Sequence, residues 1–277
     1  MSGASPMISF TGKTVVLTGC SSGIGAEAVT KLAALGASVI GVDRVASTDN
    51  SISQMIVGDL STQSGVADIA AQIDGPVDVL INNAGVAATL PWRTVMSINA
   101  LAPRDLTRLL LPKFAVDPAV VTTASQAGFL WQQNFARLNA FLAIDNWDDA
   151  LESLADFPGI DEVCYNLSKE AAIINAGNLA VDGKHIGLRS NSVSPGTVGT
   201  PLLKDFTATM GDAAISGAVT WAGRHARPGE IADAIIFLAS SDAAWISGAD
   251  IPIDGGFSAM IFRSYIAPAM AAMTASA

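Results

Sequence analysis

Short runs of β-branched and other apolar residues alternate along the chain with longer segments whose apolar residues recur every three or four positions. The short runs are typical of buried strands, and the longer segments are typical of amphipathic helices. This alternation indicates βαβ units, in which helices cover both faces of a parallel sheet. The runs predict seven strands, at residues 14–18, 38–43, 55–58, 77–81, 119–123, 190–193 and 249–253. The periodic segments predict helices at residues 24–35, 66–73, 95–111, 166–181 and 230–239.

One connection is much longer than the others. Residues 129–164, which we call the insertion, separate a strand from a helix where two to six residues are usual. Within it Trp147, Leu151 and Leu154 recur at helical spacing, so we expect helical parts. No repeat or Pro/Gly-rich linker divides the chain. We therefore expect one doubly wound α/β domain over residues 1–277, with a seven-stranded parallel sheet, the insertion, and a C-terminal tail at 258–277.

Composition narrows the class of protein. The 277 residues are 50% hydrophobic and only 14% charged, which excludes disorder and predicts a sizeable core. The net charge of −10 repels nucleic acids and anionic membranes, and no apolar run approaches the ~20 residues of a membrane-spanning helix. Two cysteines are too few for a disulfide framework, and two histidines without ligand spacing do not make a zinc site. We therefore expect a cytoplasmic protein without a metal, nucleic-acid partner or membrane partner.

A glycine-rich loop lies between the first predicted strand and the first predicted helix, and its sequence is Thr18-Gly19-Cys20-Ser21-Ser22-Gly23-Ile24-Gly25. Glycine permits a positive φ and a close approach of a pyrophosphate, which free N–H groups and the helix dipole then bind. The loop alone could be a plain turn, but its place between strand and helix indicates a dinucleotide site of a Rossmann sheet. The expected contacts are Gly19, Ser21, Ser22, Gly23, Ile24 and Gly25.

Asp43 ends the second predicted strand, 18 residues after Gly25, near the spacing at which a carboxylate accepts hydrogen bonds from the adenosine ribose. A carboxylate there repels the 2′-phosphate of NADP and favours NAD, although Arg44 could offset part of that repulsion or stack on the adenine. Alternatively, Asp43 is a polar strand end and Arg44 a solvated surface charge. Asp59 and Leu60, after the third strand, are expected beside the adenine.

Tyr165 and Lys169 are four residues apart on a predicted helix, so both project from one face. A phenol is a weak base at neutral pH, but an ammonium group and a positive nicotinamide nearby stabilise the phenolate and lower its pKa. Ser125, after the fifth predicted strand, can hydrogen-bond the same substrate oxygen. The alternative is an ordinary amphipathic helix with a surface lysine. The presence of Ser125 and the glycine-rich loop favours the catalytic interpretation.

At these residues the chain resembles the short-chain dehydrogenase/reductase family, and the resemblance extends from Gly12 to Phe257. The family pattern includes the glycine-rich loop, the Tyr-x-x-x-Lys pair, Asn82-Asn83-Ala84-Gly85, Asn99 and Pro195-Gly196. The resemblance implies that Tyr165 is the acid/base, that Ser125 orients the reacting oxygen, and that Lys169 binds the nicotinamide ribose. It also implies that Asn99 holds a water that links Lys169 to solvent. The further cofactor contacts that it implies are Asn83, Ala84, Gly85, Pro195, Gly196, Val198 and Thr200.

The chain departs from the family pattern in one respect. Ser125 and Tyr165 are 40 residues apart, whereas family members usually have about a dozen residues between them. The longer spacing resembles a subgroup that includes bacterial 3α-hydroxysteroid dehydrogenase/carbonyl reductase and coniferyl-alcohol dehydrogenase. Many members form tetramers through the helices that carry the asparagine and the tyrosine, and the insertion enters the second of these. We therefore expect a homo-oligomer, either a tetramer or a dimer that uses another surface.

The predicted reaction is hydride transfer between a secondary alcohol or ketone and NAD, with Tyr165 moving the hydroxyl proton. Trp131, Leu203 and Phe206 are candidates to line a pocket for an aromatic, alicyclic or steroid-like substrate, or they are ordinary core residues. The alternatives are epimerase, dehydratase or dehalogenase chemistry on the same scaffold, or an NAD-binding regulator without turnover. Gly19, Gly23 and Lys169 disfavour the dehalogenase, and Ser125 together with Tyr165 disfavours the regulator.

The negative charge is concentrated in the insertion. Residues 129–164 contain seven acidic residues and one basic residue, a net charge of −6 out of −10. A solvated acidic helix face explains this distribution, and a preference for amine-bearing substrates is a second interpretation.

Overall fold

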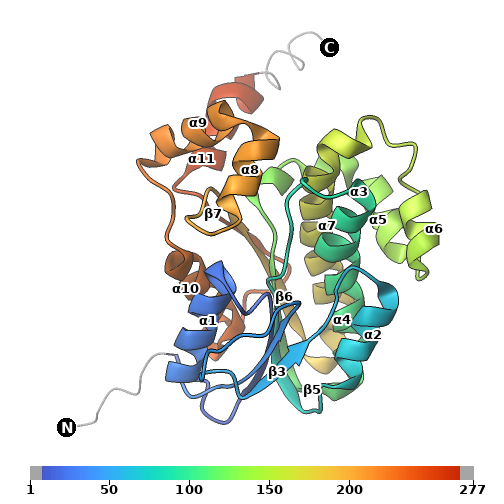
Figure 1. Ribbon diagram of the computed structural model, residues 1–277, viewed down its shortest axis with the longest axis vertical. Coiled ribbons are helices and arrows are strands. Elements are labelled where there is room, and N and C mark those ends of the chain that lie inside the picture. The colour runs from blue at the N-terminus through green and yellow to red at the C-terminus, as the bar shows by residue number, and fades with distance from the viewer. Residues whose placement is uncertain (1–7, 269–277) are drawn as a thin grey trace.

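Within residues 8–268, which the structure describes, seven parallel strands form one sheet in the computed structural model. The order across the sheet is β3-β2-β1-β4-β5-β6-β7. Helices cover both faces (Figure 1). All seven predicted strands are present, so the expected doubly wound α/β fold is confirmed. The strands are β1 (Thr14–Thr18), β2 (Ser38–Asp43), β3 (Gln54–Val57), β4 (Val77–Asn82), β5 (Phe114–Thr123), β6 (Arg189–Pro195) and β7 (Asp250–Ile253).

The strand order reverses between β1 and β4. β1 pairs with β2 on one side and with β4 on the other, and the chain reaches β4 only after crossing back from β3. Connections that leave β1 and β4 therefore diverge and open a crevice beyond the carboxyl ends of these strands. Four of the five residues of β1 are buried, because a central parallel strand has helices on both faces.

Two layers of helices complete the core. α1 (Gly23–Ala34) and α10 (Pro228–Ala239) pack together on one face, where Val29, Leu32, Ile231 and Ile235 are all fully buried. α2 (Gln63–Ala71), α4 (Ala102–Leu110) and α7 (Ile160–Asp182) cover the other face. Each layer is apolar at helical spacing, as the sequence predicts.

The helix predicted at 95–111 consists of three pieces. α3 (Trp92–Met96) runs into a π-helical turn at Ser97–Leu101, which continues into α4. A π turn holds one more residue than an α turn, so it shifts the faces of the two flanking helices relative to each other. Periodicity alone could not show this shift, because apolar residues continue through the turn.

The helix predicted at 166–181 begins six residues earlier than expected. Gly159 has φ +66°, and Asp161 and Glu162 occupy the first turn of α7, where carboxylates interact favourably with the helix dipole. The last residues assigned to the insertion therefore belong to α7. The rest contains a 3₁₀ turn at Trp131–Asn134, α5 (Phe135–Ala143) and α6 (Trp147–Glu152).

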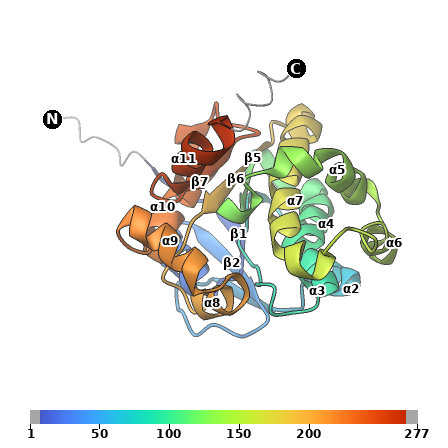
Figure 2. The same ribbon diagram turned by 90° about the horizontal axis from the view of Figure 1, so that it is seen from above.

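A fully buried arginine anchors the insertion to the core. Arg104 in α4 donates hydrogen bonds to the carbonyl oxygens of Leu142 (3.2 Å) and Ile144 (2.6 Å) and to Asp105 Oδ1 (2.6 Å). Trp147 Nε1 donates to Asp105 Oδ2 at 2.6 Å. α5 and α6 consequently lie against the outer side of the α4 and α7 layer (Figure 2).

Three further helices follow β6 and β7, and periodicity did not predict them. They are α8 (Leu203–Met210), α9 (Asp212–Ala222) and α11 (Phe257–Ile261). They gather at the end of the molecule where the strands have their carboxyl ends (Figure 1). Of the tail predicted at 258–277, residues 269–277 lie outside the described residues.

Candidate active site

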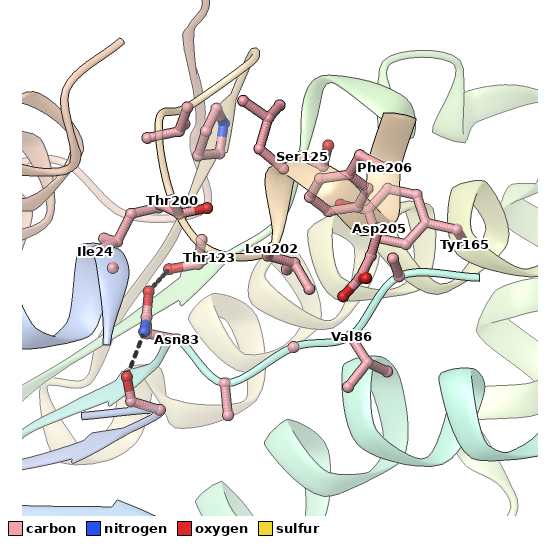
Figure 3. A pocket seen from close by; sticks show the side chains of 18 of the residues that line it. Ile24, Asn83, Val86, Thr123, Ser125, Tyr165, Thr200, Leu202, Asp205 and Phe206 are labelled. Carbon is pink, nitrogen blue, oxygen red and sulfur yellow. Dashed lines mark hydrogen bonds between the residues drawn. The ribbon is translucent and has the colours of Figure 1, made fainter. Parts of the chain in front are cut away.

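A cavity of about 650 Å³ lies beyond the carboxyl ends of the central strands, and α8 forms one wall (Figure 3). It occupies the crevice that the reversal of strand order opens. Most residues predicted for the site line it: Gly19, Ser22, Gly23, Ile24, Asp43, Arg44, Asp59, Leu60, Asn83, Ala84, Gly85, Ser125, Tyr165, Lys169, Pro195, Gly196, Val198, Thr200, Leu203 and Phe206. Four predicted site residues do not line it: Ser21, Gly25, Asn99 and Trp131.

The loops after β1 and β4 are held together by hydrogen bonds and by a close approach of their backbones at Gly19. Gly19 has φ +71°, and a Cβ on it would lie 2.8 Å from the Cα of Ala84. Thr18 Oγ1 accepts hydrogen bonds from the N–H groups of Asn83 and Ala84, both at 3.1 Å. Gly25 lies behind the cavity wall, where a side chain would collide with the carbonyl oxygen of Gly19. The loop therefore has the bare, closely packed backbone that fits a pyrophosphate group.

Asp43 is used partly by the protein itself. Its Oδ2 accepts a hydrogen bond from the N–H of Ser21 at 3.0 Å, and its Oδ1 accepts one from the N–H of Val45 at 3.3 Å. The hydroxyl of Ser21 donates to the carbonyl of Val45 at 2.9 Å. Ser21 therefore holds Asp43 beside the glycine-rich loop, and Ser21 itself does not line the cavity. Each carboxylate oxygen retains a lone pair for a ribose hydroxyl.

Tyr165 and Lys169 project together from α7 into the cavity and are almost fully buried. Lys169 Nζ lies 5.7 Å from the centre of the Tyr165 ring and donates a hydrogen bond to the carbonyl of Thr123 at 3.1 Å. Burial lowers the pKa of Lys169 to about 8. Burial also raises the pKa of Tyr165 to about 12, against the opposing effect of its hydrogen bond with Ser125. Without the positive nicotinamide, burial therefore favours the neutral phenol of Tyr165 over the phenolate.

Ser125 is held by a short turn at Gln126–Gly128. Its Oγ accepts a hydrogen bond from the N–H of Ala127 at 3.1 Å. Gly128 brings this turn against α7, since a Cβ there would lie 2.8 Å from the carbonyl carbon of Lys169. The distance between Ser125 and the Tyr165–Lys169 pair thus depends on a glycine contact, although the insertion lies between them in the sequence.

Asn99 lies in the π turn and organises the wall of the cavity from behind. Its Oδ1 accepts from the N–H of Val86, and its Nδ2 donates to the carbonyl of Val86, both at 2.9 Å. Nδ2 also donates to Ser168 Oγ at 3.0 Å. The side-chain amide therefore ties the segment after β4 to α7. Both of its side-chain N–H donors are used in this way, and the water that the resemblance implies at Asn99 stays a prediction.

The expected substrate residues fall into two groups. Leu203 and Phe206 line the cavity, and the centre of the Phe206 ring lies 5.0 Å from that of Tyr165. Trp131 does not line it, because the turn that carries it packs against α7 and its ring faces the core and Phe135. The sequence analysis missed Asp205, which also lines the cavity. The helical spacing of Leu202, Asp205 and Phe206 could have indicated it.

Metal-binding clusters and membrane-spanning helices can be assessed over residues 8–268, which the structure describes. In that range no three His, Cys, Asp or Glu side chains are grouped in a way that could hold a metal ion. No helix in the same range combines the length and the apolar character needed to span a bilayer.

Known protein families match most of the chain. A family model described as "short chain dehydrogenase" matches residues 13–140, and one described as "Enoyl-(Acyl carrier protein) reductase" matches residues 151–258. Coniferyl-alcohol dehydrogenase of a Pseudomonas strain is 31% identical over 89% of this chain and 96% of its own. The 3-alpha-hydroxysteroid dehydrogenase/carbonyl reductase of Comamonas testosteroni is 30% identical over 89% of this chain and 97% of its own.

A solved structure is similar over nearly its whole length. The 3-alpha-hydroxysteroid dehydrogenase from Pseudomonas sp. B-0831, solved with NADH, is 29% identical, covers 91% of this chain and 99% of its own, and has a TM-score of 0.76. The subgroup indicated by the long spacing between Ser125 and Tyr165 is thus found among the relatives. The chain therefore belongs to the short-chain dehydrogenase/reductase family, whose members are oxidoreductases that bind a nicotinamide cofactor.

Proposed function

We propose that this protein is an NAD(H)-dependent oxidoreductase that interconverts a secondary alcohol and its ketone, with Tyr165 as the acid/base. The observation that supports this function best is the meeting of Ser125, Tyr165 and Lys169 in one cavity with the bare loop at Gly19. NAD, when bound, would accept a hydride from the alcohol carbon and, as NADH, return it to the carbonyl carbon.

In the reducing direction the chain's own residues handle the oxygen of the substrate. The hydroxyl of Tyr165 donates its proton to the carbonyl oxygen as that oxygen gains negative charge. The hydroxyl of Ser125 donates a hydrogen bond to the same oxygen and stabilises the developing charge. Lys169 adds a positive charge near the phenol, which favours the phenolate that remains after the proton has left. Lys169 is also proposed to bind the nicotinamide ribose, and Asn99 ties the segment after β4 to α7, the helix that carries Lys169.

Replacing the acid/base hydroxyl tests the proposal directly. We expect Tyr165→Phe to retain NADH binding, measured by fluorescence titration, and to lose steady-state turnover by about 10³-fold or more. The chain has one other tyrosine, Tyr265, which is 69% exposed. Tyr265→Phe is therefore a matched control and should keep full turnover. Undiminished turnover in Tyr165→Phe would disprove the assignment.

The preference for NAD over NADP rests on Asp43. Its carboxylate lies at the carboxyl end of β2 among the lining residues and would repel a 2′-phosphate. A relative solved with NADH is consistent with this preference. We expect kcat/KM with NADH to exceed that with NADPH, and Asp43→Ala to reduce the ratio. Equal rates with both cofactors in the wild-type protein would contradict the argument.

The proposed substrates are aromatic, alicyclic or steroid-like secondary alcohols and ketones. The wall that faces Tyr165 is largely apolar and includes Leu203 and Phe206, as is usual for pockets that bind ring systems. A panel of ring ketones and secondary alcohols, assayed by NADH absorbance, tests this class. Turnover restricted to short acyclic substrates would refute it.

We also propose a cytoplasmic homo-oligomer. Trp245, Val181 and Tyr265 are largely exposed apolar side chains that a second copy could cover. Because α5 packs against α7, a dimer through another surface is favoured over contact through that helix. A strictly monomeric mass by light scattering at micromolar concentration would refute the oligomer. The two free, buried cysteines, Cys20 and Cys164, are consistent with a reducing compartment.

A further inference from the structure

One face of α8 presents a carboxylate among apolar side chains to the cavity, which the neighbouring Lys204 also lines. Leu202, Asp205, Phe206 and Met210 occupy positions i, i+3, i+4 and i+8 and all line the cavity. Such spacing describes a single helix face. Three of these four residues are apolar, so the position of Asp205 would be expected to hold an apolar side chain if the face served only to cover a ring.

The carboxylate of Asp205 points from α8 into the cavity, toward the segment that contains Val86 (Figure 3). It is half-buried there, and among the residues that the structure describes no side chain or N–H group hydrogen-bonds to it. The other two carboxylates that line the cavity are both engaged. Asp43 accepts from the N–H of Ser21, and Asp59 accepts from the N–H of Ser61 at 2.8 Å. Of these three carboxylates, Asp205 therefore has both oxygens available for a group on the substrate, whereas Asp43 retains one lone pair on each oxygen for a ribose hydroxyl.

A purely structural role for Asp205 is available and makes a different prediction. The residue lies in the first turn of α8, where a negative charge interacts favourably with the helix dipole. Removing that interaction would lower the stability of the helix and would affect all substrates alike. A carboxylate that binds substrate instead affects only those substrates that carry a hydrogen-bond donor.

We propose that Asp205 determines specificity by binding a hydrogen-bond donor, a hydroxyl or an ammonium group, on a ring substrate at a position away from the reacting carbon. This inference rests on the proposed function, because it assumes that a ketone or alcohol reacts at Tyr165. A half-buried carboxylate without a hydrogen-bond donor, on a helix face that is otherwise apolar, loses solvation, and a donor from the substrate restores a hydrogen bond. The phenyl ring of Phe206, next to Asp205, would contact the apolar body of the same substrate.

The experiment compares ring ketones that differ in one group. 4′-Hydroxyacetophenone and 4′-(aminomethyl)acetophenone carry a hydrogen-bond donor, and 4′-methylacetophenone does not. The corresponding 3′ isomers change the distance between the donor and the reacting carbonyl group. In the wild-type protein the donor-bearing ketones should have the lower KM. Asp205→Leu should raise their KM about 10- to 100-fold while changing that of the methyl ketone less than about twofold. Asp205→Asn keeps an acceptor but loses the charge, so it should impair the aminomethyl ketone more than the hydroxyl ketone.

The control removes the same charge from the start of the neighbouring helix. Asp212 lies in the first turn of α9, is exposed and does not line the cavity. Asp212→Asn should leave every KM unchanged. The inference is wrong if Asp205→Leu changes all ketones equally, if only the KM for NADH changes, or if the wild-type protein turns over ring ketones without any preference for donors. Absence of NADH oxidation with every ketone would instead overturn the proposed function itself.

Discussion

Gly128 offers a sharp test of how the site is positioned. A Cβ at this residue would lie 2.8 Å from the carbonyl carbon of Lys169, and ordinary contact begins at 3.4 Å. In Gly128→Ala the turn that holds Ser125 must therefore move away from α7 by about 0.6 Å, because both groups in contact belong to rigid backbone. A displacement of 1 Å in a reacting group costs about 100-fold in rate. We expect kcat to fall about 10- to 100-fold.

The assay separates this effect from a loss of folding or of cofactor binding. NADH affinity by fluorescence titration should stay within about twofold of wild type, because the nearest neighbours of a Cβ on Gly128 belong to α7 rather than to the glycine-rich loop. Gly177→Ala is the matched control, since this glycine lies on α7 itself and a Cβ there meets nothing within 4 Å. It should leave kcat unchanged. If Gly128→Ala retained wild-type kcat, the argument that this contact sets the position of Ser125 would be refuted.

Two further predictions concern stability. Burial lowers the pKa of Lys169 from 10.5 to about 8, which destabilises the folded state at every pH where the unfolded lysine is charged. Lys169→Met should therefore raise the free energy of unfolding at pH 7 by about 3 kcal/mol. This gain should disappear between pH 8 and 10.5, where the lysine of the folded protein is already neutral. A gain that persisted at pH 10.5 would contradict it. Arg104→Met removes a buried charge partner and should cost about 3–5 kcal/mol in urea unfolding. Arg108→Met, one turn away, removes an exposed ion pair with Asp145 and one hydrogen bond to the carbonyl of Leu142, and should cost about 2 kcal/mol or less. Equal losses would argue against the buried anchor.

The sheet and the nucleotide loop could be predicted from the sequence because each has a local signal. A buried parallel strand is a continuous apolar run, as in β1, and the turn at Gly19 needs a residue that tolerates φ +71°. The pair Tyr165 and Lys169 could be predicted for the same reason, since four residues on a helix fix their common face. These features depend on neighbours in the sequence, so the sequence shows them.

Features that depend on distant parts of the chain could not be predicted. Trp131 and Phe206 are both aromatic and were equal candidates for the substrate pocket. Trp131 faces the core because the turn that carries it packs against α7. The π turn around Asn99 interrupts a helix whose apolar pattern continues unbroken. The site therefore differs from expectation where tertiary contacts, rather than local pattern, orient a side chain.

The assignment of the whole chain to one domain stays a prediction, as do the roles of the individual site residues. Residues 269–277 of the tail lie outside the described part of the chain.

The anchor at Arg104 limits how the insertion can be exchanged between proteins. A chimera that moved residues 129–164 onto a shorter relative would need an arginine and an aspartate at the positions of Arg104 and Asp105. Without them the carbonyl of Ile144 would lose its donor and the indole N–H of Trp147 its acceptor. Conversely, joining Gly128 directly to Ile160 would leave the guanidinium group of Arg104 on the apolar flank of α4 without its carbonyl acceptors, and with Asp105 as its remaining partner. The insertion and α4 must therefore be redesigned as one unit.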